Sequence, residues 1–116
     1  MNDLSLQAAG VVGVTIAVIH GVLGETKVFA QARIEPARTK LLLRLVWQAG
    51  AVAWAGIGLL LAAAPYMTSL TARHGIIAVA VTSYAVGGAA NGYATRGRHF
   101  GWMALAAACV LALAGW

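Results

Sequence analysis

Charged residues are scarce in this chain: Asp, Glu, Lys and Arg make up only 9% of its 116 residues, and just three residues are acidic. A soluble domain normally carries about 25% charged residues, which keep its surface hydrated. Hydrophobic residues account for 61% of the sequence. Such a composition excludes a water-facing surface over most of the molecule. It predicts an integral membrane protein with one domain, residues 1–116.

Cysteine and proline are almost absent as well. The single cysteine, Cys109, lies in an apolar run, which excludes an internal disulfide and a cysteine metal cluster. We expect it to pack as a small apolar side chain. Pro36 and Pro65 fall at or beyond the ends of apolar stretches, where they break no helix. Because Lys and Arg are missing from the N-terminus, the first apolar stretch is expected to be a retained helix and not a signal peptide.

Four apolar stretches are present, each close to the length of about 20 residues with which an α-helix crosses the hydrocarbon core of a bilayer. They cover residues 6–28, 41–64, 75–94 and 100–116. A spanning segment must pair its own backbone polar groups, and a helix does so. We therefore predict an all-α integral membrane bundle of four transmembrane helices.

Basic residues are divided unequally among the loops that join these stretches. Only Arg73 lies in the second loop, and the other seven lie in or beside the first and third: Lys27, Arg33, Arg38, Lys40, Arg44, Arg96 and Arg98. Cytoplasmic loops are enriched in Lys and Arg, so we expect both termini to face the periplasm or the exterior. The basic balance does not indicate nucleic-acid binding, because no basic helix or aromatic platform accompanies it.

Small residues recur along the predicted helices at helical spacing. Helix association in lipid depends on close backbone approach, which Gly and Ala permit. The clearest packing positions are Gly13, Ala17, Gly21, Gly24, Gly58, Gly88 and Gly92. These stripes either close a monomeric bundle or pair the chain with another one. Besides the lipid bilayer, the expected partners are therefore a second copy or a larger membrane protein.

Polar side chains within the predicted helices gather in their cytoplasmic half or near the middle. Polar groups are costly in a membrane, so each is a candidate for function: His20, Glu25, Arg44, Gln48, Tyr84 and Asn91. We hypothesise a network in which His20 is hydrogen-bonded to Gln48, with Glu25 paired to Arg44. The network either fixes helix register, holds a ligand, proton or ion, or forms a docking surface, and the sequence leaves these alternatives open.

The sequence contains no pattern that predicts a cofactor, a metal ion or a catalytic set. His20 and Glu25 are five residues apart, so they point about 140° away from each other on an ideal helix, unlike an HExxH pair. His74 and His99 are expected at opposite faces of the bilayer, which leaves no two histidines placed to ligate one haem. Ser-His-acid and Cys-His sets are also missing, so an enzyme is the less favoured class.

Three short motifs are His20-Gly-Val-Leu-Gly-Glu25, Arg44-Leu-Val-Trp47-Gln48 with Trp54, and Thr95-Arg-Gly-Arg-His99-Phe-Gly-Trp102. Together they resemble a family of small uncharacterised bacterial inner-membrane proteins with HxxLGE-like, RxxWH-like and RGRHxxW-like motifs. The resemblance covers most of the chain and implies a four-helix membrane protein without an assigned reaction. The family pattern has histidine after the tryptophan, where this chain has Gln48. That departure removes a position that would have partnered His20 as a second metal or haem ligand.

Three functions fit these observations. The first is a non-enzymatic subunit that self-associates or joins a larger membrane complex, supported by the small-residue stripes and short loops. The second is a small oligomeric transporter or channel whose polar pathway uses His20, Gln48, Tyr84 and Asn91. The third is an enzyme or redox protein acting on a lipid or quinone, with His20 and Glu25 as acid–base groups. We favour the first, and the second is the main alternative.

Overall fold

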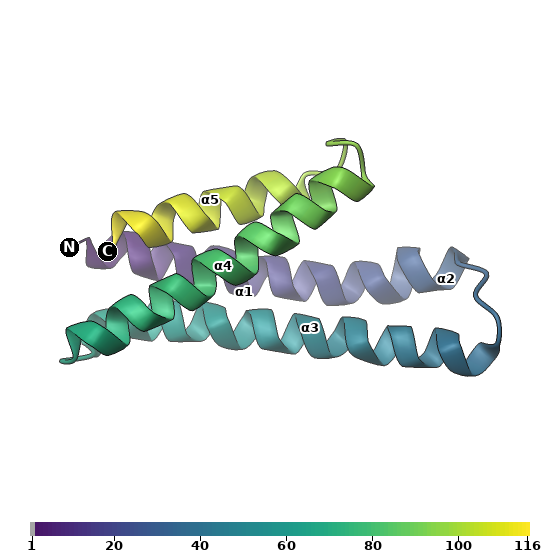
Figure 1. Ribbon diagram of the computed structural model, residues 1–116, viewed down its shortest axis with the longest axis horizontal. Helices are drawn as coiled ribbons and strands as arrows, with labels where there is room; N and C mark the ends of the chain where they lie inside the picture. Colours follow the sequence, from purple (N-terminus) through teal and green to yellow (C-terminus); the bar gives the residue numbers. More distant parts are fainter. Residues whose placement is uncertain (1) are drawn as a thin grey trace.

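The computed structural model describes residues 2–116, and all regular structure in that range is helical (Figure 1). In chain order the elements are α1 (Asp3–Leu23), a π-helical turn (Gly24–Val28), α2 (Phe29–Gln31), α3 (Ala37–Ala63), a 3-10 turn (Ala64–Tyr66), α4 (Leu70–Ala94) and α5 (Gly101–Ala114). α2 directly continues α1 through the π-helical turn, so the two form one long helix. The chain therefore consists of two helical hairpins, α1–α3 and α4–α5.

Three helices are long and apolar enough to cross a membrane: Asp3–Gln31, Ala37–Tyr66 and Leu70–Ala94. The fourth, α5, is apolar but has only 14 residues. It rises about 21 Å, compared with about 30 Å for the hydrocarbon core. The prediction of four apolar helices is confirmed, and three of them have spanning length. The fourth is shorter than the predicted stretch 100–116.

Side-chain caps mark the starts of α1 and α4. The side chain of Asn2 accepts a hydrogen bond from Ser5 N at the start of α1, and Ser69 caps α4 in the same way through Ala72 N. α3 begins at Ala37, ahead of the predicted 41, and includes Arg38 and Lys40. Long basic side chains favour a helix as well as apolar ones do, so the helix extends beyond its apolar stretch.

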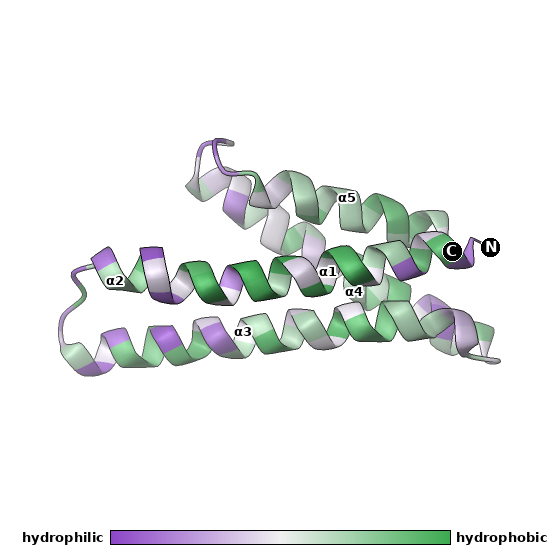
Figure 2. Ribbon diagram, turned by 180° about the vertical axis from the view of Figure 1, so that it is seen from behind, coloured by the Kyte–Doolittle hydropathy of each residue, from purple (hydrophilic) through white to green (hydrophobic). Residues whose placement is uncertain are grey.

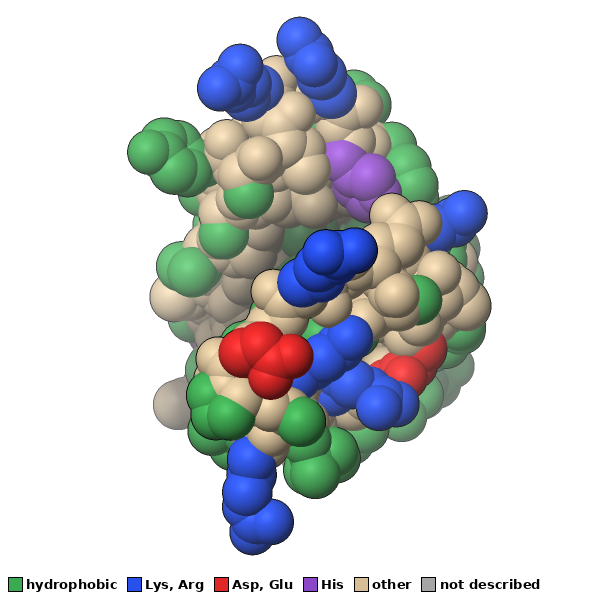
Figure 3. Space-filling model, turned by 90° about the vertical axis from the view of Figure 1, so that its right-hand side faces the viewer, with side chains coloured by type: hydrophobic (Ala, Val, Ile, Leu, Met, Phe, Trp, Pro, Cys, Tyr) green, Lys and Arg blue, Asp and Glu red, His purple; other side chains and the backbone are tan. Residues whose placement is uncertain are grey.

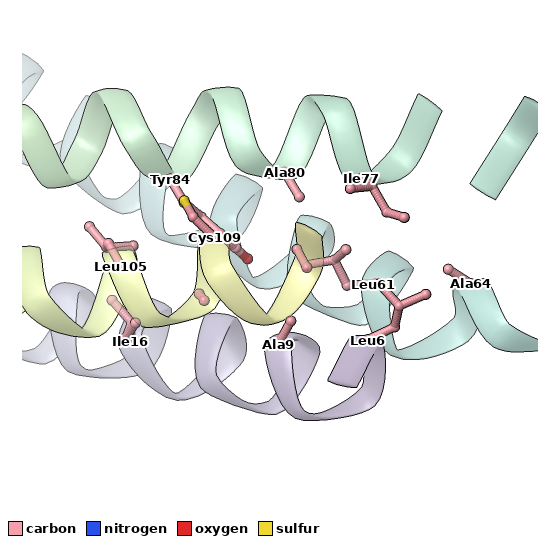
Figure 4. Close-up of a cluster of buried hydrophobic side chains, with 12 residues drawn as sticks. Leu6, Ala9, Ile16, Leu61, Ala64, Ile77, Ala80, Tyr84, Leu105 and Cys109 are labelled. Carbon is pink, nitrogen blue, oxygen red and sulfur yellow. The ribbon is translucent and has the colours of Figure 1, made fainter. Parts of the chain in front are cut away.

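The two hairpins pack closely at the end of the molecule that carries the termini and diverge at the other end (Figure 1). α4 crosses α3 obliquely, and α5 packs on α4 and α1. Figure 4 shows the buried cluster that joins the helices, which includes Leu6, Leu61, Ile77, Tyr84 and Cys109. The expectation that Cys109 packs inside is therefore confirmed. The α1–α3 hairpin extends beyond this core.

The tightest contact between α1 and α3 lies at Gly10 and Gly58. A Cβ atom at Gly10 would lie 2.5 Å from the Gly58 carbonyl oxygen, and one at Gly58 would lie 2.8 Å from Val14 N. These neighbours are backbone atoms that no rotamer change can move aside. The approach of the two helices therefore requires glycine at both positions.

We expect Gly58→Ala to lower the free energy of unfolding by about 1–3 kcal/mol, because the added methyl group must push α1 and α3 apart. Gly56→Ala is the matched control on the same helix, since a Cβ there meets nothing within 4 Å. The control should be neutral or stabilising by up to about 1 kcal/mol through helix propensity. Unfolding in mixed micelles, followed by circular dichroism, measures both. Equal losses would contradict the packing described.

Candidate functional site

Two of the sequence motifs meet at the extended end of the α1–α3 hairpin. The segment His20–Glu25 ends α1 and opens the π-helical turn, and Arg44–Gln48 lies beside it on α3. Trp47 Nε1 donates a hydrogen bond of 2.8 Å to the His20 carbonyl oxygen. Gln48 Nε2 donates one of 3.0 Å to the Gly21 carbonyl oxygen. Side-chain hydrogen bonds across a helix pair hold one helix in register with the other.

Glu25 is held between two donors on α3. Its Oε2 accepts a hydrogen bond of 2.6 Å from Arg44 Nη2, so the expected ion pair is present. Its Oε1 accepts a hydrogen bond of 3.0 Å from Gln48 Nε2. Both carboxylate oxygens therefore have a charged or amide donor. This arrangement makes Glu25 an anchor between the helices.

His20 contacts aromatic rings instead of Gln48. Its imidazole stacks on the Trp47 indole with 4.1 Å between ring centroids and 5° between planes, and it lies 4.8 Å from the Trp54 ring. The hypothesised hydrogen bond between His20 and Gln48 is not formed within the described chain. The rotation of the two helices about their own axes brings Gln48 to the carbonyl oxygen of Gly21, one residue after His20.

Gly24, the first residue of the π-helical turn, leaves the space that the Trp47 indole fills. A Cβ at Gly24 would overlap Trp47 Nε1, so glycine is required for this ring to lie on α1. Phe29, which follows the turn, packs edge-on against the same indole at 5.7 Å. π-helical turns are often found at functional sites. Here the turn carries Glu25, which is the only acidic side chain in residues 2–116 that forms an ion pair with α3.

Tyr84 and Asn91 both lie on α4, and only Tyr84 contacts the α1–α3 hairpin beside His20. Tyr84 is fully buried and donates a hydrogen bond of 3.0 Å to the Trp54 carbonyl oxygen. Asn91 accepts one of 3.1 Å from Trp102 N and lies 3.4 Å from His99 Nδ1. The Trp54 ring lies between two of these residues, 4.8 Å from His20 and 6.2 Å from the Tyr84 ring. The predicted network is thus divided in two, with Asn91 apart, because the α4–α5 hairpin diverges from α1–α3 at this end.

The third motif, residues 95–102, forms the turn between α4 and α5. Arg96 and Gly97 have positive φ angles of 52° and 73°, a conformation that glycine adopts without steric cost. His99 Nδ1 accepts a hydrogen bond of 3.0 Å from Gly101 N, and Trp102 Nε1 donates one of 3.0 Å to the Gly97 carbonyl oxygen. The polar side chains of this motif therefore close a turn.

Most of the predicted packing glycines contact another helix of the same chain. Gly13 lies against the Tyr84 ring, and Gly21 lies against Gln48 and Ala51. Gly88 and Gly92 face α5, where their neighbours are Leu105 and Trp102. The remaining positions are Gly24 and Gly58, described above, and Ala17, which is 1% exposed. Small residues on α1 and α3 also leave a shallow space along their seam.

That space is a groove of about 560 Å³ along α1 and α3, and no residue of α4 or α5 lines it. Figure 2 shows the α1–α3 hairpin from the side turned away from α4 and α5. Its lining comes from α1, α3 and the first residues of the π-helical turn: Ala17, Val18, Gly21, Val22, Glu25, Thr26, Gln48, Ala51, Val52 and Ala55. The middle is apolar, and the polar residues lie at one end. Sequence reasoning missed the groove, although the valines flanking the small-residue stripes were a signal of it.

Arg73 is a second residue that sequence reasoning missed, since it was counted only as a loop charge. Its side chain is 6% exposed, and Nη2 donates to Asp3 Oδ1 at 2.6 Å and to the Gly115 carbonyl oxygen at 3.4 Å. Beside it, His74 stacks on Trp116 with 4.2 Å between centroids. Arg73 therefore joins the first turns of α1 and α4 to the end of α5.

Within residues 2–116, no three His, Cys, Asp or Glu side chains are grouped so that they could hold a metal ion. Comparisons of the chain with protein-family models, curated proteins and solved structures found no match. The contacts of the α1–α3 hairpin and its groove are therefore the features from which a function is inferred.

We expect Trp47→Phe to lower the free energy of unfolding by about 0.5–1.5 kcal/mol, because it removes the hydrogen bond to the His20 carbonyl and keeps an aromatic ring beside the imidazole. Trp116→Phe is the control, because it also keeps a ring stacked on His74 and the Trp116 indole N–H donates no hydrogen bond within residues 2–116. Unfolding in mixed micelles measures both. A Trp47→Phe protein as stable as the control would show that the hydrogen bond does not join the helices.

Proposed function

We propose that this chain is a non-enzymatic subunit of the bacterial inner membrane that works by packing its α1–α3 hairpin against another transmembrane chain. The observation that carries the proposal is the uncovered face of that hairpin. Only Ala51, Gly58 and Leu61 are buried among the 27 residues of α3. Small residues along a seam let a further helix approach closely, which is how helices associate in lipid.

The proposal places both termini outside and the two basic segments inside. Figure 3 looks onto the end of the molecule with the α2–α3 loop and the α4–α5 turn, and Lys and Arg side chains gather there. Such residues favour the cytoplasmic face. The helices of spanning length cross the bilayer, and α5 enters as the fourth. Its shorter length is accommodated when flanking residues such as Arg96, Arg98 and Trp102 reach toward the interface.

The polar residues support a packing role better than a chemical or transport role. Glu25 has donors on both oxygens, and Tyr84 and Asn91 satisfy backbone groups of neighbouring segments. A pathway shared by His20, Gln48, Tyr84 and Asn91 is less well supported, because Asn91 lies apart at the α4–α5 turn and the Trp54 ring lies between His20 and Tyr84. Polar groups that satisfy one another fix the positions of helices, which a docking surface requires.

Native mass spectrometry of the protein, extracted gently from its own host membrane, tests this proposal. We expect a complex whose mass is a small multiple of the chain mass or includes a larger membrane protein. A monomer in the same extract in which other inner-membrane complexes remain intact would contradict it. Those intact complexes are the control for the extraction.

A further inference from the structure

The groove on the α1–α3 face is apolar along most of its length and polar at one end. Its apolar part is flanked by Val18 and Val22 on α1 and by Val52 on α3. At the polar end, Glu25 projects from the α1 side and Arg44 from the α3 side, and the ion pair between them shows that they lie at the same level. Their side chains are 40% and 45% exposed. Opposite charges therefore lie on the two sides of the seam, and part of each charged side chain is exposed.

This distribution is self-complementary under a two-fold rotation about an axis parallel to the helices. Such a rotation turns the α1–α3 face onto an identical face and places α1 of each copy opposite α3 of the other. Glu25 of each copy then faces Arg44 of the other, at one depth in the membrane. A guanidinium group has five donors in a planar fork. Within residues 2–116 Arg44 donates one hydrogen bond, to Glu25, so the group can serve a second carboxylate.

The apolar walls follow the same symmetry. Gly10 of α1 lies against Gly58 and Ala62, and Gly21 lies against Gln48 and Ala51. Interpolation between these contacts places Val18 level with Val52. Both valines are exposed, at 59% and 73%. In the two-fold arrangement Val18 of each copy meets Val52 of the other, above the floor formed by the small residues.

We propose that the occupant of the groove is a second copy of this chain, bound face to face about a two-fold axis along the membrane normal. This inference rests on the proposed function and names its partner. A lipid tail offers no charged group to the exposed sides of Glu25 and Arg44, whereas a second copy offers one of opposite sign to each. An antiparallel copy would carry the two ion pairs to opposite sides of the bilayer. Of these two orientations, the parallel one pairs both the charges and the valine walls.

Cross-linking in the host membrane tests the predicted contact. In a Cys109→Ala background, a chain with Val18→Cys is co-expressed with a differently tagged chain with Val52→Cys, and a thiol oxidant is added. We expect the mixed-tag dimer to form several-fold more than with the control pair Val86→Cys and Val110→Cys, which lie on α4 and α5 and are each 66% exposed. Equal yields for the two pairs would overturn the inference.

A charge-swapped chain separates the interface from folding. Glu25→Arg combined with Arg44→Glu keeps an ion pair within the chain, and two swapped chains still place opposite charges across the axis. One swapped and one unswapped chain place like charges opposite each other. With the cysteines at positions 18 and 52, matched pairs should cross-link several-fold more than the mixed pair. Equal cross-linking of matched and mixed pairs would refute the charge contact.

The proposed function and the proposed second copy are contradicted by different results. If native mass spectrometry finds a complex with a larger membrane protein while the cysteines at 18 and 52 do not cross-link, the second copy is the wrong occupant. The proposed function as a packing subunit stands in that case. If the native mass is that of a monomer, both proposals fail.

Discussion

The close approach of α1 and α3 at Gly10 and Gly58 is the contact on which the other features of the hairpin depend. Backbone atoms of the two helices meet there without an intervening side chain. Further along the seam, the short separation lets Trp47 and Gln48 reach carbonyl groups of α1. In water this pairing would be driven by apolar burial, whereas in lipid it depends on close packing and interhelical hydrogen bonds. Glycine and polar side chains therefore act together to hold α1 against α3.

The rest of the molecule holds this hairpin at one end and leaves it free at the other. Tyr84 lies on Gly13 and bonds the Trp54 carbonyl, which fixes α4 near the middle of the seam. Arg73 ties α4 and the end of α5 to the start of α1. Beyond these contacts α4 and α5 diverge (Figure 1). The outer face of α1–α3 is thus uncovered, and that face carries the groove.

The sequence predicts what depends on composition and on depth along a helix. Apolar stretches predict four helices, and the opposite charges of Glu25 and Arg44 at one depth predict their pairing. Depth does not determine the rotation of a helix about its axis, which is why His20 was assigned to Gln48 although it stacks on Trp47. Nor does depth show which helices diverge, so Asn91 was placed in a network from which the α4–α5 hairpin separates it. Arg73 was missed because its partners, Asp3 and Gly115, are close only in the folded chain.

The central claim is that the α1–α3 face is covered by protein in the membrane. Oxygen-induced relaxation of a ¹⁹F label in lipid bilayers tests it most directly, since oxygen concentrates in lipid. A trifluoroethyl group is attached through Val52→Cys on this face or Val79→Cys on α4, both in the Cys109→Ala background. Val52 is 73% exposed and Val79 57% exposed in the single chain. The account predicts weaker relaxation at position 52 than at position 79. Equal or stronger relaxation at 52 would contradict it.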